Sequence, residues 1–281
     1  MSHRDVLFVC IVVFVDSIDE VGNSNGTQCV YTFLDQNFSP QDLTLFQQLF
    51  HLPQQTVYGS IGGHNSSTQC MVNPSSCKEA NLDIQYIMAV GQNVRTYNYF
   101  QNSSNFLIDW FMQLTNEVDP PMVISISYGA IESTVSKSYM ASFDISVKSL
   151  AVMGVTILSG SGDDGASGIA AMKGLDHCSY APIWPASSPY VLAVGATQGP
   201  ESGSQEVTCA SNTGGTITSG GGFSNLYEQP SWQADAVNGY FDAATSAGVA
   251  PVSGYNISGR GYPDISLMGH AYEVIIGLLT T

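Results

Sequence analysis

A strand–helix–strand pattern in the middle of the chain constrains the fold more than any other feature. Residues 122–127 (MVISIS) are a short, mostly β-branched run, which is typical of a buried strand. Apolar residues then recur at helical spacing over residues 143–151, and Gly154 follows where a left-handed helix cap is needed. Residues 155–159 (VTILS) predict a second buried strand. Short joints between these elements predict a βαβ unit, and therefore a parallel sheet with a right-handed crossover.

Two segments follow the predicted strands at the sheet edge where α/β proteins place their chemistry. Ser127-Tyr128-Gly129 ends the first strand, and the glycine-rich loop 160–168, which contains Asp163, ends the second. The loop alone suits either phosphate binding or a tight turn, and no lysine follows to make it a phosphate-binding loop. The neighbouring strand end could present its backbone to an extended peptide as an added strand.

The rest of the chain predicts one domain, because no repeat or charged linker divides it. Residues 190–195 and the segment around 263–265 are predicted to be further strands, with residues 219–224 as a loop between them. Residues 199–218 are rich in serine, glycine and threonine and predict a surface loop.

Two carboxylates lie four residues apart in an apolar segment, KEANLDIQYIMAV (residues 78–90). Spacing of i, i+4 on a helix puts Glu79 and Asp83 on one face, where each raises the pKa of the other and the pair can share a proton. One interpretation is an acid-tuned base. The other is that two acids in the first turns complement the helix dipole. An inward-facing charge in so apolar a segment would be costly without a purpose.

Composition excludes two classes of partner and permits one kind of compartment. Seven basic against 23 acidic residues give a net charge of −16, which argues against a nucleic-acid or anionic membrane surface. Only 11% of residues are charged. With so few cations, little positive self-repulsion builds up when the carboxylates are neutralised, so an acidic working compartment is permitted.

The amino terminus and the sequons indicate export. Residues 6–15 (VLFVCIVVFV) fit the apolar part of a signal peptide, here predicted as residues 1–17, although Asp5 lies where a signal would be basic and leaves a buried strand as the alternative. Five Asn-x-Ser/Thr sequons support export. They begin at Asn25, Asn37, Asn65, Asn102 and Asn256, and Pro40 weakens the second.

The cysteines fit an oxidising compartment. Plausible bridges are Cys70 with Cys77 and Cys178 with Cys209, which leave Cys29 unpaired once Cys10 has departed with the signal. No cysteine or histidine motif has the spacing of a transition-metal site.

Several segments in order carry a resemblance to a known family. They are LDQNFSPQDLTLFQQLF, EANLDIQYI, ISISYG, SGDDGAS, WPASSPYVLAVGAT, SGGGFSNLY and GRGYPDIS. From about Gly22 to Gly277 the chain resembles the sedolisin family of serine-carboxyl peptidases. The resemblance implies an α/β fold with a subtilisin-like parallel sheet flanked by helices, in a peptidase domain over residues 22–281 whose C-terminal part is missing.

The resemblance also implies roles for the acidic residues in peptide hydrolysis at acidic pH. Glu79 would be the general base, because a carboxyl group titrates near the working pH and a histidine there would be protonated. Asp83 would orient Glu79 and tune its pKa, and a protonated Asp163 would donate a hydrogen bond to the oxyanion. Asp164 stands where the family more often has serine, and adds a second carboxyl beside the oxyanion site.

Ser127 and Gly129 would pair with the substrate backbone, so the expected partner is a peptide or protein. The expected product is either a tripeptide or an internal fragment, and the expected destination is the lysosome or the extracellular space.

The sequence lacks other parts that the family implies. No Gly-Thr-Ser motif, which holds the family's nucleophilic serine, occurs in the 281 residues. The family's calcium site would lie in the missing C-terminal part, so no cofactor is expected in this chain, and the family's long pro-segment is also not present. Ser161, Ser219 and Ser224 lie in glycine-rich loops but are not expected to take the nucleophile's place. Two hypotheses remain: an acid-acting endopeptidase or tripeptidyl peptidase represented by an incomplete sequence, or a secreted, non-catalytic peptide-binding protein.

Overall fold

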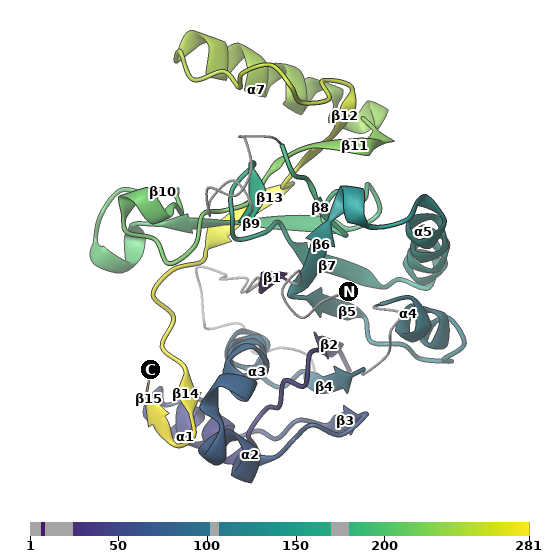
Figure 1. The fold of residues 1–281 in the computed structure, drawn as a ribbon. Coiled ribbons are helices and arrows are strands. Elements are labelled where there is room, and N and C mark those ends of the chain that lie inside the picture. Colours follow the sequence, from purple (N-terminus) through teal and green to yellow (C-terminus); the bar gives the residue numbers. More distant parts are fainter. Residues whose placement is uncertain (1–6, 9–24, 102–106, 170–179, 281) are drawn as a thin grey trace.

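A central, mostly parallel sheet organises the molecule (Figure 1). The computed structural model describes residues 7–8, 25–101, 107–169 and 180–280. The sheet order is β10-β9-β7-β5-β2-β4-β3, and β13 also pairs with β9. Its strands are β2 (Thr27–Thr32), β3 (Gly59–Ile61), β4 (Arg95–Phe100), β5 (Val123–Ile126), β7 (Thr156–Gly160), β9 (Leu192–Gln198), β10 (Val207–Thr208) and β13 (Ile265–Met268). All pairs are parallel except the antiparallel pair of β10 with β9, which confirms the predicted parallel sheet.

Helices cover both faces of this sheet, as predicted. The described α-helices are α1 (Pro40–Leu49), α2 (Ser67–Val72), α3 (Lys78–Val90), α4 (Ile108–Leu114), α5 (Lys137–Val152) and α7 (Ala234–Ser246). On one face, Val30 of β2 packs in a cluster with Ala80 and Ile84 of α3. Tyr31, the next residue of β2, lies in the cluster formed with α4 and α5. Because successive strand residues point to opposite faces, the two clusters lie on opposite sides of the sheet.

Three smaller sheets complete the fold. The first consists of β1 (Leu7–Phe8), β6 (Tyr128–Ile131) and β8 (Ile183–Trp184), with β6 between the other two. The others pair β11 (Gly222–Glu228) with β12 (Gly259–Tyr262), and β14 (Ile275–Ile276) with β15 (Leu279–Thr280). Short 3₁₀ segments are η1 (Pro74–Cys77), η2 (Glu132–Thr134), η3 (Pro200–Ser202), η4 (Ser211–Thr213) and η5 (Ser231–Gln233).

The predicted elements in the middle of the chain are present. Strands β5 and β7 pair in parallel across α5, and Gly154 has a φ of 88° directly after the helix. One prediction was wrong: residues 219–224, expected to be a loop, overlap β11. The reason is that Gly222 and Phe223 pair with Tyr262 and Gly261 of β12, a partner 39 positions away in the chain that local sequence does not reveal.

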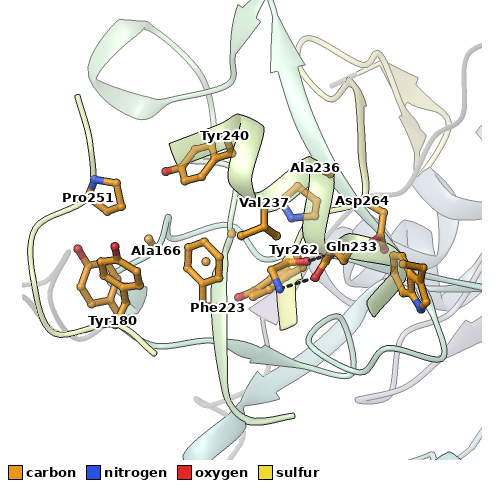
Figure 2. A pocket seen from close by; sticks show the side chains of 16 residues that line it. Ala166, Tyr180, Phe223, Gln233, Ala236, Val237, Tyr240, Pro251, Tyr262 and Asp264 are labelled. Atoms are coloured by element: carbon orange, nitrogen blue, oxygen red, sulfur yellow. Dashed lines mark hydrogen bonds between the residues drawn. The ribbon is translucent and has the colours of Figure 1, made fainter. Parts of the chain in front are cut away.

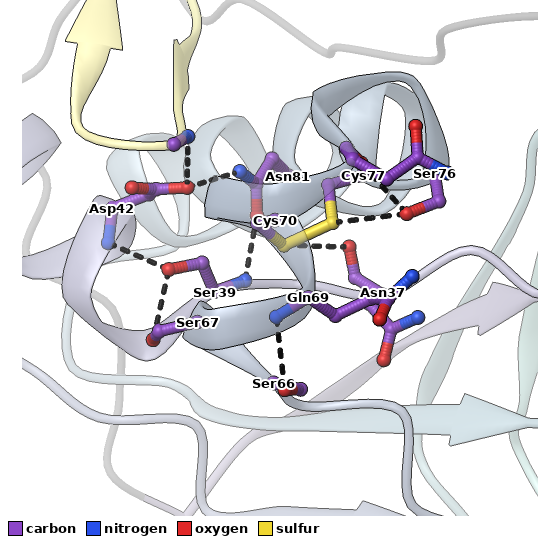
Figure 3. Close-up of a disulfide and its surroundings, with 12 residues drawn as sticks. Asn37, Ser39, Asp42, Ser66, Ser67, Gln69, Cys70, Ser76, Cys77 and Asn81 are labelled. Carbon is purple, nitrogen blue, oxygen red and sulfur yellow. Dashed lines mark hydrogen bonds between the residues drawn. A yellow bond between two sulfur atoms is a disulfide. The ribbon is translucent and has the colours of Figure 1, made fainter.

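The cysteine predictions have different outcomes. Cys70 and Cys77 form a disulfide, which joins α2 to the residue before α3 (Figure 3). Cys209 does not form the expected bridge: it is a free, buried thiol whose Sγ donates to the carbonyl of Ile217 at 3.5 Å. Its expected partner, Cys178, lies outside the described residues. Cys29 is free and buried.

Export signals are only partly within the described residues. Of the predicted signal peptide, residues 7–8 alone are described, as β1. Asn25 and Asn65 are exposed, and Asn102 lies outside the described residues. The Asn256 amide donates to the Ser224 carbonyl at 2.8 Å, so a glycan on that nitrogen would disturb this contact. No described helix combines the length and apolarity needed to cross a bilayer.

Candidate active site

The amino end of α3 carries the two predicted carboxylates and is anchored at its first turn. Glu79 and Asp83 are both buried. The disulfide at Cys77 fixes the chain immediately before the helix. Cys77 itself supplies no side-chain cap; instead, Oε1 of Gln36 accepts a hydrogen bond from the backbone N–H of Glu79 at 3.2 Å. Because first-turn N–H groups lack helical partners, this bond holds the turn that carries Glu79.

A serine at the end of β5 links the sheet to this helix. Ser127 is fully buried, and its Oγ donates to Oδ1 of Asp83 at 2.9 Å. The other carboxylate oxygen, Oδ2 of Asp83, has no hydrogen-bond partner among the described residues, and the same holds for Oε1 of Glu79. Buried polar atoms are nearly always paired. The two unpartnered oxygens are therefore unusual, and they leave acceptor sites that a reacting group could use.

The third carboxyl comes from the loop after β7. Gly162 has a φ of 113°, and its carbonyl accepts a hydrogen bond from the N–H of Gly220 at 2.7 Å. The carbonyl of Asp163 accepts from the N–H of Thr218 at 2.8 Å. These bonds join two glycine-containing loops. The loops can approach this closely only with glycine at position 220, because a Cβ there would lie 2.2 Å from the Ser161 carbonyl oxygen. The Asp163 side chain is half-buried, and its Oδ1 has no hydrogen-bond partner in the part of the chain that the structure describes.

The pKa shift of Glu79 indicates that the tertiary structure brings the three acids close together. Burial, followed by the nearby charges of Asp83 and Asp163, raises the pKa of Glu79 well above its usual range, and the Ser127 hydroxyl partly opposes this. Burial also raises the pKa of Asp83, again opposed by Ser127. Burial, with a contribution from Asp164, raises the pKa of Asp163 to about 8. Carboxyl groups shifted in this direction hold protons in acid and can exchange them with a reacting group.

The remaining predicted residue, Gly129, lies in β6 at an edge already paired with another strand. Leu7 and Phe8 of β1 lie opposite Gly129 and Tyr128 in an antiparallel register. A Cβ at Gly129 would lie 2.7 Å from Cγ2 of Ile183, so the strand needs glycine to pack against β8. The expected substrate edge can therefore receive an extended antiparallel segment.

Sequence reasoning did not predict which groups the side chains of Ser127 and Gln36 bind. Ser127 was expected to offer its backbone to substrate, but its side chain is bound to Asp83. The spacing of 44 residues between the two carries no local signal. Gln36 is likewise 43 residues from the N–H that it binds.

Two of the serines in glycine-rich loops have structural hydrogen bonds. Ser224 is fully buried; its Oγ donates to Oε2 of Glu132 at 2.6 Å and accepts from the N–H of Tyr227 at 2.8 Å. The Oγ of Ser219 accepts from the N–H of Ala196 at 2.9 Å. Among the described residues, no group of three or more His, Cys, Asp or Glu side chains is arranged to hold a metal ion.

Comparison with known proteins finds relatives in sequence and in structure. No family model matches the chain. Tripeptidyl-peptidase 1 of Homo sapiens is 34% identical over 261 residues, which are 90% of this chain and 43% of the human protein. Tripeptidyl-peptidase 1 of Dictyostelium discoideum is 38% identical over 252 residues, or 88% of this chain and 37% of that protein. The chain thus spans less than half the length of these curated relatives.

A solved structure of Pseudomonas sedolisin, a serine-carboxyl proteinase complexed with two molecules of pseudo-iodotyrostatin, has a similar fold. The TM-score is 0.68 at 24% sequence identity, over 93% of this chain and 71% of the sedolisin chain.

Proposed function

The chain belongs to the sedolisin family of serine-carboxyl peptidases, and from that premise we propose that its three buried carboxyls serve peptide-bond hydrolysis in acid. The observation that carries the proposal is their mutual electrostatic contact: two acids of α3 and one from the loop after β7 are brought together, and each has a buried oxygen without a hydrogen-bond partner among the described residues. A purely structural acid would be expected to have its oxygens paired.

In this proposal the three acids have distinct roles. Glu79 accepts the proton of the attacking serine hydroxyl and later delivers it to the leaving amine. Asp83, held by Ser127, orients Glu79 and shares its proton. Asp163 has a pKa raised to about 8, so it is protonated at acidic pH and can donate a hydrogen bond to the tetrahedral oxyanion. The hydrogen bond from Ser127 lowers the pKa of Glu79, which favours the ionised form that a base requires.

The pairing of β6 with an extended segment of the chain supports a peptide as the substrate. Residues 7–8 of the chain itself pair there antiparallel, opposite Tyr128 and Gly129. A substrate backbone in the same place would run beside Ser127 and approach Asp83 and Glu79. We propose this strand as the substrate-binding strand.

The proposal has two versions, which differ in whether a nucleophilic serine completes the site. In the first, a serine outside these 281 residues completes the site, and the protein is an endopeptidase or a tripeptidyl peptidase. In the second, the protein binds peptides without cleaving them. No Gly-Thr-Ser motif occurs in the 281 residues, so the serine of the first version would come from outside them.

We place the protein in the secretory pathway, with delivery to the lysosome or the extracellular space. The Cys70–Cys77 disulfide supports an oxidising compartment. Exposed sequon asparagines at positions 25 and 65 are compatible with glycosylation there.

The test uses the 281-residue chain and the product of its full-length transcript, assayed at about pH 4 with two internally quenched peptides. One peptide has a free amino terminus and the other is blocked. Turnover that is lost in Glu79→Gln and in Asp163→Asn would support catalysis. Cleavage of the blocked peptide indicates an endopeptidase, and cleavage of the free peptide alone indicates a tripeptidyl peptidase.

Peptide binding without turnover in both proteins, and without labelling by a serine-directed fluorophosphonate, would establish the non-catalytic version and refute catalysis. An absence of both binding and turnover would refute both versions.

A further inference from the structure

A cavity lined by aromatic rings lies between α7, β11 and β12, outside the set of acids described above (Figure 2). Its volume is about 530 Å³, within the range of pockets that hold small ligands or several side chains. Six aromatic residues contribute to its wall: Tyr180, Phe223, Trp232, Tyr240, Tyr255 and Tyr262. In the view of Figure 2, the Phe223 ring lies between Tyr180 and Tyr262, with Tyr240 and Pro251 above them.

The rings support one another, so the cavity is largely preformed. The centroids of Tyr180 and Tyr255 are 5.6 Å apart in an edge-to-face contact, and those of Phe223 and Tyr255 are 5.3 Å apart. Behind them, Phe241 of α7 stacks on Phe223 at 5.4 Å. Such pairs have preferred geometries, which restrict how the wall can rearrange.

Two polar side chains of the wall, Asp264 and Gln233, are already engaged. Oδ2 of Asp264 lies 2.6 Å from the Arg260 guanidinium and accepts from the N–H of Ala193 at 2.8 Å. The amide of Gln233 binds the backbone of Gly261 with both its oxygen and its nitrogen. No other charged side chain is among the lining residues that the structure describes. A charged ligand group entering the cavity would therefore lose its hydration without gaining a partner, whereas a neutral ring would gain stacking contacts.

Some wall residues of the cavity are close along the chain to the loop and strand that carry the proposed peptidase site. Ala166 of its wall is three residues from Asp163, and Gly221 of its wall follows Gly220, which binds Gly162. On the other side, the hydroxyl of Tyr262 accepts from the N–H of Ile183 at 2.8 Å. Ile183 in turn packs against Gly129 of the proposed substrate strand.

We propose that this aromatic cavity is a subsite for uncharged, ring-bearing residues of a peptide, namely Pro, Phe, Tyr or Trp, when that peptide is bound at the carboxyl site. Aromatic-lined grooves recognise such residues by ring stacking, and proline adds little conformational entropy cost. The inference rests on the proposed function because the peptide is the ligand of that site.

The chain contains its own reporter for this subsite. Trp232 of the wall is 65% exposed, whereas the other two tryptophans, Trp110 and Trp184, are 3% and 0% exposed. We expect titration with a short neutral peptide containing Phe and Pro to produce a saturable change in tryptophan fluorescence. Peptides of equal length with Lys or Asp at the ring positions are expected to bind at least about tenfold more weakly. Equal responses to the neutral and charged peptides would overturn the proposal.

Two matched substitutions on α7 sharpen the test. Ala236 is an exposed residue of the cavity wall, and Ala243 is an exposed residue of the same helix outside it. Ala236→Arg should weaken binding of the ring-bearing peptide about tenfold or more because it places a charge in the cavity. Ala243→Arg should leave binding unchanged. Identical effects of the two variants would overturn the subsite, as would a fluorescence change that follows protein concentration instead of peptide concentration.

The result also separates this inference from the proposed function. Ring-selective binding without turnover in any form of the protein would uphold the subsite and refute catalysis. Turnover with the same preference for neutral and charged peptides in wild type and in Ala236→Arg would uphold catalysis and refute the subsite.

Discussion

Two buried aspartates, Asp42 of α1 and Asp83 of α3, differ in how many hydrogen bonds their carboxylate oxygens accept. Asp42 of α1 is 0% exposed and accepts hydrogen bonds from the Asn81 amide and the N–H groups of Gly277 and Leu278, all within 2.9 Å. Asp83 is 3% exposed and, among the described residues, accepts a hydrogen bond from Ser127 alone. Figure 3 shows Asp42 between α3 and the turn of the β14–β15 hairpin.

The difference separates a structural carboxylate from one available for chemistry. Near Asp42, helix α3 also holds the β14–β15 hairpin through Gln85, whose amide exchanges two hydrogen bonds with the backbone of Ile275. The donors supplied by the fold fully use the Asp42 oxygens. Asp83 and Glu79, on another face of α3, each keep an oxygen without a hydrogen-bond partner among the described residues. Burial, followed by the charge of Asp83, raises the pKa of Glu79. We conclude that hydrogen-bond supply, and not burial, distinguishes the two regions.

The largest effect on stability is expected from removing the carboxylate of Asp42, whose oxygens are hydrogen-bonded. Asp42→Ala leaves two backbone N–H groups and the Asn81 amide without their acceptor, and should lower the free energy of unfolding by about 3 kcal/mol or more. Asp83→Asn should cost much less, since it removes a charge that has few donors. Urea denaturation of the two variants measures both changes. A loss of equal size in both would remove the distinction between the regions.

The pH dependence of stability provides the second test. The pKa values of Glu79, Asp83 and Asp163 are raised in the folded state, so above pH 4 the native protein binds more protons than the unfolded chain. Stability from these groups is therefore greatest in acid and falls as the pH rises toward about 8, the raised pKa of Asp163. Each group contributes at most about 1.4 kcal/mol per pH unit.

Thermal denaturation between pH 4 and pH 8 measures this slope. Asp163→Asn should flatten it, because the substituted side chain does not titrate. A melting temperature that increases over this interval and is unaffected by the substitution would show that the site acids titrate at ordinary pKa values.

The smallest effect on stability is expected from removing the Ser127 hydroxyl, which donates to Asp83 in the candidate site. Ser127→Ala removes the hydrogen bond to Oδ1 of Asp83 and should cost about 1 kcal/mol of stability. Because that bond lowers the pKa of Asp83, its loss should raise this pKa further. Carboxyl NMR titration tests the direction, with Ser133→Ala, at an exposed serine, as the control. An unchanged Asp83 titration would show that Ser127 is a packing residue only.

Local sequence patterns determined a large part of the fold and one half of the candidate site. Hydrophobic periodicity predicted β5, α5 and β7, and the i, i+4 spacing put Glu79 and Asp83 on one helical face. These features depend on residues within a turn or a strand of each other, and that is the range over which periodicity carries information.

Only the tertiary structure decided which distant groups meet. It brought Asp163 to Glu79, bound Ser127 to Asp83 across 44 positions, and clamped Leu278 to Asp42 across 236. It also gathered the aromatic rings of α7, β11 and Tyr180 around one cavity. Such contacts arise when sheet order and helix packing close the chain on itself. For that reason the sequence alone identified the acids, while the fold determined which of them are paired and which keep an oxygen without a partner among the described residues.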